Sequence, residues 1–215
     1  MVQSNLLMMY LKKLAALLLA FSTTQAFAQE GGAQVENVTR FTFISPGFGH
    51  EQRVGKNTTL VAHAYLSPYA SIFYSNAFGE ESFNAEFRLE TAVSLQYRYY
   101  YNFARRQEKG QRTAKNSMNY IAPKYTALFT NRRMSSAYLP EENTRAVNTL
   151  GVVWGLQRNL PGRLSLDFNA GLGYQFAKGH TYNDMGMKVE KSYGNVAIMS
   201  CITLGIWLGK KEAEQ

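Results

Sequence analysis

The segment from Phe83 to Tyr101 alternates strictly between an apolar row and a polar row. The odd-numbered row is Phe83, Ala85, Phe87, Leu89, Thr91, Val93, Leu95, Tyr97, Tyr99 and Tyr101, and the even-numbered row is Asn84, Glu86, Arg88, Glu90, Ala92, Ser94, Gln96, Arg98 and Tyr100. Successive side chains of a strand point to opposite faces, whereas a helix would scatter them round its circumference. The alternation therefore predicts one long strand with an apolar face and a polar face.

Other segments repeat this pattern, most clearly between 146 and 209. Strands are expected at 38–45, 48–54, 58–74, 83–101, 117–130, 146–158, 162–176 and 193–209. Pro68 and Pro123 weaken two of these assignments, because proline cannot donate to a strand ladder. Residues 38–54 also fit one bent strand, which would make the strand count odd. The predicted fold class is all-β.

Residues 1–28 have the three-part pattern of a cleaved secretory signal peptide. Lys12 and Lys13 precede the apolar run Leu14–Phe21, and Ala26-Phe27-Ala28 forms a small-x-small cleavage site. The run is shorter than the roughly 20 apolar residues that a membrane-spanning helix needs. Residues 29–215 are then one exported domain, whose charge is +6 because the two lysines are removed from 23 basic residues against 15 acidic ones.

The two faces indicate which side of the sheet meets lipid. Aromatic residues cluster at one strand end, at Tyr97, Tyr99, Tyr101 and Phe103, with Tyr100 among them. Such belts mark membrane interfaces. Glycines such as Gly151 and Gly171 fall on the polar face, where a narrow lumen needs room. We therefore expect the apolar rows to face lipid; the alternative is a secreted lipocalin-like barrel with the apolar rows inside.

Strands can span a lipid bilayer only as a closed barrel, because lipid cannot satisfy unpaired backbone groups. The expected strands give an eight-stranded, antiparallel, up-and-down transmembrane β-barrel, located in the bacterial outer membrane. Its external loops are 75–82, 131–145 and 177–192, and its periplasmic turns include the long basic connection 102–116.

Three segments together resemble small outer-membrane β-barrels of the OmpA/OmpX-like kind. They are FISPGFGHEQRVGKNTTL (43–60), LQYRYYYNFARRQEKG (95–110) and LGVVWGLQRNLPGRLSLDFNAGLGYQF (150–176). The resemblance implies an eight-stranded barrel without a reaction of its own, with membrane lipid, lipopolysaccharide and the barrel-assembly machinery as partners. Such proteins commonly end on an aromatic residue, whereas here Trp207 is followed by a polar tail.

The polar rows carry the expected site, a network of paired charges inside the barrel. Its members are Arg40, Glu51, Arg53, Glu86, Arg88, Glu90, Arg98, Lys124 and Asp167. An eight-stranded barrel is barely wide enough for side chains, and unpaired charges there cost several kcal/mol. We expect a filled plug in preference to a polar conduit.

Sequence motifs for chemistry are weak, so no catalytic, cofactor-binding or metal residue is predicted. His50-Glu51 fails the HExxH zinc pattern because Val54 stands in the fifth position. The sequence favours a non-enzymatic barrel of structural or surface-binding role, whose partner on the loops is unknown. The alternatives are a small-solute pore and a lipid A-modifying enzyme, whose candidate residues would be Glu141, Glu142, His180, Thr181 and Asp184.

The positive charge has no basic helix or stacking platform of the kind that binds nucleic acid, so nucleic acid is not an expected partner. The basic run at 105–115 is expected to be a solvated turn or a contact with anionic lipid or periplasmic partners. Cys201, the single cysteine, is expected to be an inert residue of the polar face.

Overall fold

The computed structural model describes residues 34–77, 80–135, 138–139 and 141–209, with the side chains of 70–84 left out. The chain divides into residues 1–33 and a compact unit that begins at Gln34. The predicted signal peptide, residues 1–28, lies outside the described residues.

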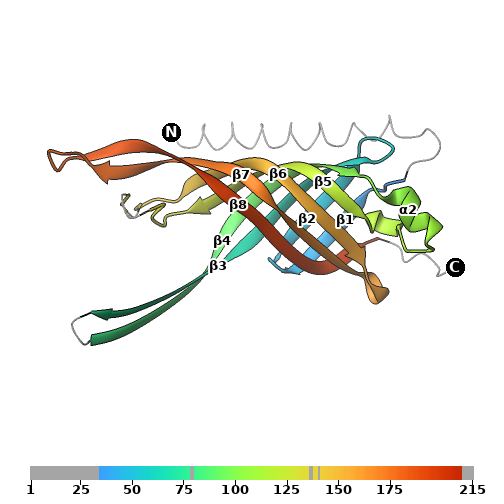
Figure 1. The fold of residues 1–215 in the computed structure, drawn as a ribbon, viewed down its shortest axis with the longest axis horizontal. Coiled ribbons are helices and arrows are strands. Elements are labelled where there is room, and N and C mark those ends of the chain that lie inside the picture. The colour runs from blue at the N-terminus through green and yellow to red at the C-terminus, as the bar shows by residue number, and fades with distance from the viewer. Residues whose placement is uncertain (1–33, 78–79, 136–137, 140, 210–215) are drawn as a thin grey trace, which may run out of the picture. The chain divides into compact units, whose positions relative to one another are not determined.

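Eight antiparallel strands form one closed ring in which each strand pairs with its sequence neighbours and β8 pairs with β1 (Figure 1). The strands are β1 (Val38–Ile44), β2 (Gly47–Arg53), β3 (Thr58–Ala77), β4 (Glu80–Tyr100), β5 (Asn119–Thr130), β6 (Arg145–Asn159), β7 (Leu164–Tyr182) and β8 (Lys188–Leu208). This confirms the all-β, up-and-down barrel and its count of eight.

Two strands, not one bent strand, occupy residues 38–54. Ser45 has a positive φ of 51°, and Thr42 donates a hydrogen bond to its carbonyl oxygen at 2.8 Å, which fixes a tight turn before Gly47. The prolines that weakened two strand assignments are both accommodated, since Pro68 lies in β3 and Pro123 in β5.

Two hairpins are longer than the sequence pattern predicted. β3 pairs with β2 as far as Tyr65, and beyond it pairs only with β4 up to Ala77. β7 pairs with β6 as far as Phe176, and beyond it continues in register with β8 to Tyr182. We call the end of the barrel that carries these hairpins the hairpin end.

At the opposite end the connection between β4 and β5 contains helix α2 (Phe103–Glu108) and the short helix η2 (Ala114–Asn116). The turn between β6 and β7 holds the short helix η3 (Pro161–Arg163). We call this the α2 end, comprising residues 34–37, 53–57, 101–118 and 158–163. None of the described helices is long and apolar enough to cross a membrane.

The polar rows face the interior and the apolar rows face outward. In β4, Glu90, Ser94, Gln96 and Arg98 are buried, whereas Leu89, Val93, Leu95 and Tyr97 are exposed. Every strand contributes exposed apolar side chains, among them Phe41, Phe48, Leu66, Ile121, Val152, Leu172 and Ile198. The sheet therefore has the reverse of the arrangement found in a water-soluble barrel, whose large apolar residues fill the centre.

Close backbone approach explains the interior glycines of β6 and β7. Gly151 lies opposite Gly173 in the register, and Gly171 lies opposite Val153. A Cβ atom at Gly171 would overlap the carbonyl oxygen of Val152, which is backbone and has no rotamer through which to move away. Glycine is therefore required where these strands curve tightly round the interior.

We predict that Gly171→Val destabilises the folded barrel by about 3 kcal/mol, because the added side chain overpacks against backbone. The neighbouring Ala170→Val, whose side chain points outward, is the control and should fold like the wild type. The free energy of unfolding in urea, followed by tryptophan fluorescence, measures both. Equal stability of the two variants would contradict the close approach.

Candidate functional site

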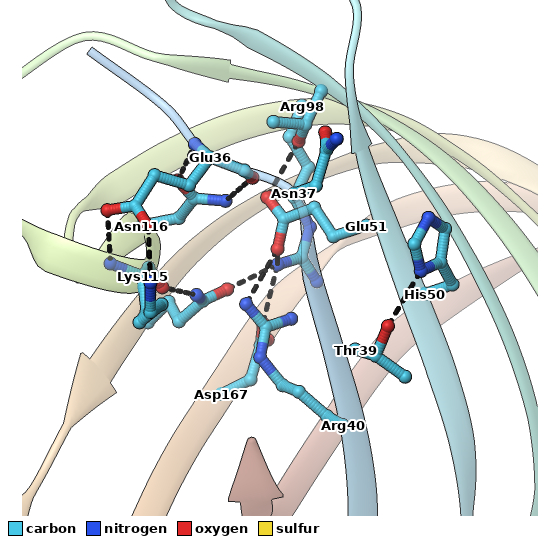
Figure 2. A network of polar contacts seen from close by, with 12 residues as sticks. Glu36, Asn37, Thr39, Arg40, His50, Glu51, Arg98, Lys115, Asn116 and Asp167 are labelled. Carbon is cyan, nitrogen blue, oxygen red and sulfur yellow. Dashed lines mark hydrogen bonds and ion pairs between the residues drawn. The ribbon is translucent and has the colours of Figure 1, made fainter. Parts of the chain in front are cut away.

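A network of ion pairs crosses the interior of the barrel near the α2 end, with Arg98 of β4 at its centre (Figure 2). The Arg98 Nη1 atom lies 2.7 Å from Asp167 Oδ2 of β7 and 4.0 Å from Glu51 Oε2 of β2. Arg40 of β1 binds the same Glu51 oxygen through Nη2 at 2.7 Å. These four side chains are at most 9% exposed, so strands distant in the sheet are joined across the lumen.

Tyrosine hydroxyls and an amide complete the shell of these charges. Tyr100 donates to Glu51 Oε1 at 2.6 Å, and Tyr120 donates to Asp167 Oδ1 at 2.8 Å. Arg98 donates to Gln157 Oε1 at 2.8 Å and its guanidinium lies 4.0 Å from the centre of the Tyr120 ring. The carboxylates thus receive both charge and hydrogen bonds, the condition under which buried ion pairs are tolerated.

The interior glycine of β6 makes room for this arrangement. A Cβ atom at Gly155 would collide with the ring of Tyr120. The Tyr120 ring therefore occupies the space that a side chain at position 155 would fill, and its hydroxyl donates to Asp167. The sequence pattern placed glycine on the polar face, and the structure shows which aromatic ring occupies the space.

A small polar cavity lies beside the network, farther from the α2 end. Its volume is about 30 Å³, and Arg40, His63, Lys124 and Cys201 are among its lining residues. Lys124 donates to Asn169 at 2.9 Å, and the His63 ring stacks on Tyr65 with centroids 4.6 Å apart. Space on this scale holds one or two water molecules and is far smaller than a ligand pocket of about 300–1,000 Å³.

The α2 end of the lumen is closed by the residues just before β1 and by the segment around η2. Val35 and Met118 are fully buried against Tyr100 and Tyr120. Glu36 holds this closure in place: its backbone N–H donates to Asn116 Oδ1 at 2.7 Å, and its carboxylate pairs with Lys115 Nζ at 2.6 Å. The long connection 102–116, expected as a turn, is therefore in part a lid.

Six of the nine predicted network residues are buried, five of them inside the barrel and one, Glu90, at the hairpin end just beyond the last pairing of β4 with β5. They are Arg40, Glu51, Glu90, Arg98, Lys124 and Asp167. Glu90 belongs to a separate cluster, in which it binds Arg132 Nε at 2.6 Å and Thr130 Oγ1 at 2.6 Å. Arg53 is half-buried at the α2 end of β2.

Glu86 and Arg88 do not lie in the lumen. They pair with each other, and their side chains are 43% and 50% exposed. Both precede Ala92, the first residue of β4 that pairs with β5. They stand on the hairpin beyond the barrel, where no interior exists for them to enter.

The predicted aromatic belt is present in part. Tyr97, Tyr99 and Tyr101 are each about half exposed on the outward face. Tyr100 points inward, as its even position requires, and is fully buried. Phe103 lies in α2 and packs against the buried cluster around Tyr100, so it closes the lumen end and does not extend the outward belt.

A cleft of about 400 Å³ lies at the hairpin end between the loop after β5 and the β7–β8 hairpin. Its lining residues are Glu141, Glu142, Asn143, Thr144, Arg145, Lys178, His180, Lys188 and Glu190. Glu141 accepts hydrogen bonds from the backbone N–H of His180 at 2.9 Å and pairs with its Nδ1 at 2.8 Å, and it also binds Arg145 at 2.8 Å. Glu141 therefore fastens the loop to the hairpin.

The structure brings together only some of the residues that were candidates for lipid A chemistry. His180 and Glu141 form a pair, whereas Thr181 projects from the opposite face of β7 because it is the next residue of the strand. Asp184 is exposed in the hairpin turn. The Thr181 hydroxyl therefore does not face the His180 ring, as the nucleophile of a His-assisted reaction would have to.

In the described part of the chain, no three His, Cys, Asp or Glu side chains are placed to hold a metal ion. Comparison with family models, curated proteins and solved structures finds no match to this chain.

We predict that Glu51→Leu lowers the free energy of unfolding by about 3–5 kcal/mol, because Arg40 loses its buried carboxylate partner and Arg98 is left with one carboxylate, that of Asp167. Urea unfolding monitored by tryptophan fluorescence measures the change.

Glu86→Leu is the matched control, since it removes the same carboxylate from the exposed pair and should change stability by less than about 0.5 kcal/mol. If both variants unfold like the wild type, the interior network contributes no stability.

Proposed function

We propose that this protein is an outer-membrane β-barrel of structural and surface-binding role, exported after removal of residues 1–28. The observation that carries the proposal is the orientation of the sheet, with apolar rows outside and paired charges inside. An antiparallel barrel with this orientation has lipid as its natural solvent.

The free energy of exposing apolar side chains to water supports a lipid environment. An exposed large apolar side chain forgoes about 1.5–3 kcal/mol that burial would supply. Val152, Leu172, Val196 and Ile198 are each more than half exposed. Monomeric soluble proteins rarely expose apolar patches larger than a few hundred Å², and here the patch runs round all eight strands.

The binding part of the role is assigned to the hairpin end. A filled lumen with a closed α2 end leaves no wide path for solutes. The binding surface of the barrel is therefore assigned to its external loops. The charged cleft between Glu141 and Lys188 lies there, with both signs of charge on its walls. Membrane lipid, lipopolysaccharide and the assembly machinery are the partners that the location would supply.

We predict that Val152→Arg destabilises the barrel in phospholipid vesicles by about 2–4 kcal/mol, because the new charge would meet hydrocarbon. Phe87→Arg is the matched control: Phe87 is more exposed, but it lies on the hairpin beyond the barrel, so its replacement should change little. Urea unfolding and the heat-dependent shift of the folded band on a gel report the result. A harmless Val152→Arg would refute the lipid-facing assignment.

The proposal also sets the orientation of the barrel. Trypsin added to intact cells should cleave after Lys188 or Lys191 in the external hairpin and leave Arg105–Arg112 uncut. Mass spectrometry of the fragments identifies the sites, and permeabilised cells provide the control in which the α2 end becomes accessible. Cleavage at the α2 end in intact cells would reverse the orientation.

A further inference from the structure

Positive charge is concentrated at the α2 end of the barrel. This end carries nine basic and two acidic residues, namely Arg53, Lys56, Arg105, Arg106, Lys109, Arg112, Lys115, Arg158 and Arg163 against Glu36 and Glu108. Glu36 is engaged with Lys115. An anionic partner is therefore favoured at this end, and the geometry of two arginines narrows down its kind.

Arg158 is the last outward residue of β6 and continues an apolar row. Leu150, Val152 and Trp154 precede it on the same face, and all three are exposed. Its guanidinium donates to the Gln157 carbonyl oxygen at 2.7 Å and to Asn119 Oδ1 at 2.6 Å. These neutral acceptors orient the group at the rim of the apolar surface but leave its charge uncompensated.

Asn102 and Asn119 connect Arg158 to α2. The carbonyl oxygen of Asn102 accepts the backbone N–H of Arg106 at 3.1 Å, its Oδ1 accepts the backbone N–H of Asn119 at 2.9 Å, and Asn119 in turn accepts from Arg158. Arg106 therefore lies in the neighbourhood of Arg158, and the two positive charges repel each other. Arg106 donates through Nε and Nη2 to the carbonyl oxygen of Arg112, at 3.3 and 2.9 Å. Burial holds the pKa of the Arg106 guanidinium below its ordinary value. Among the residues that the structure describes, no carboxylate pairs with either arginine. These two neighbouring cations therefore lack an anionic partner.

Amphipathic side chains lie beside Arg158. Tyr101 accepts a hydrogen bond from Trp154 Nε1 at 2.7 Å and one from Asn119 Nδ2 at 3.5 Å. Asn119 is also the residue that holds Arg158. Tyrosine and tryptophan of this kind settle at the level of lipid headgroups, where one end of the ring is apolar and the other is wet.

We propose that Arg106 and Arg158 form a binding site for the phosphate of an anionic glycerophospholipid in the leaflet at the α2 end. The acyl chains would lie along the outward row that includes Trp154 and Val152. A lipid fits better than a soluble anion because Arg158 stands at the rim of the apolar face. Each arginine keeps N–H donors beyond those already used, and a phosphate accepts them in pairs. This inference rests on the proposed membrane location.

The test is native mass spectrometry of the detergent-solubilised full barrel titrated with phosphatidylglycerol and, in parallel, with phosphatidylcholine. The wild type should retain phosphatidylglycerol in preference. The double variant Arg106→Gln with Arg158→Gln should bind it about tenfold more weakly, as expected for the loss of one or more charge-assisted hydrogen bonds, and should lose the preference. Arg106→Lys with Arg158→Lys keeps both charges and should retain most of it, which also covers a glutamine variant that fails to fold.

Arg105→Gln with Lys109→Gln is the matched control, because it removes the same number of positive charges from the α2 end, at exposed positions beside Arg106. It should bind like the wild type, whereas an equal loss in this control would mean diffuse charge and overturn the site. Unchanged binding by the Arg106/Arg158 variant, or displacement of the lipid by equimolar inorganic phosphate, would overturn it too. A wild type that folds in vesicles but shows no headgroup preference refutes the lipid site alone; one that does not enter vesicles refutes the membrane proposal as well.

Discussion

Closure of the sheet between β1 and β8 is the constraint on which the rest of the structure depends. β1 has only seven residues, and its pairing with β8 shifts register between Thr42 and Ile44. Once the ring is closed, every strand of the barrel wall has a hydrogen-bonded neighbour on both sides, and the wall has no edge strand. Closure also separates two solvents, because each strand must then present one row to the outside and the other to a space only a few side chains wide.

The narrowness of that space determines the chemistry inside. Five charged side chains lie in the region around the network and its neighbouring cavity, namely Arg40, Glu51, Arg98, Lys124 and Asp167. Bulk water cannot compensate them, so the protein does: Arg98 is shared between the carboxylates of Glu51 and Asp167. Because the partners come from β1, β2, β4 and β7, the same contacts that neutralise the charges also tie the wall together across the lumen.

The sequence predicted the faces of the strands well because period two is local. The parity of a residue decides whether it points inward, and Tyr100 could have been assigned to the interior on this ground alone. The position of a residue along the barrel axis cannot be read from the local sequence, because it depends on where the neighbouring strands end. Glu86 and Arg88 have the right parity for the lumen, yet they stand beyond the last pairing of β4 with β5.

The lid was not predictable for a related reason. Lys115 and Asn116 both adopt positive φ angles, 53° and 61°, although neither residue type demands that conformation. Both residues are held by Glu36, which lies just before β1, about 80 positions earlier in the sequence. A pattern read along the chain contains no sign of such a contact, so this segment was expected to be a simple turn.

The two ends of the barrel differ in charge in a way that the net value conceals. Residues 66–91, 131–145 and 177–193 hold seven Lys and Arg against eight Asp and Glu, whereas the α2 end holds nine against two. The lid, formed by the residues just before β1 and the segment around η2, separates the basic surface from the lumen. The cations at this end therefore have little influence on a solute inside the barrel. Their electric field acts on groups outside the wall, at the level where the outward apolar rows end.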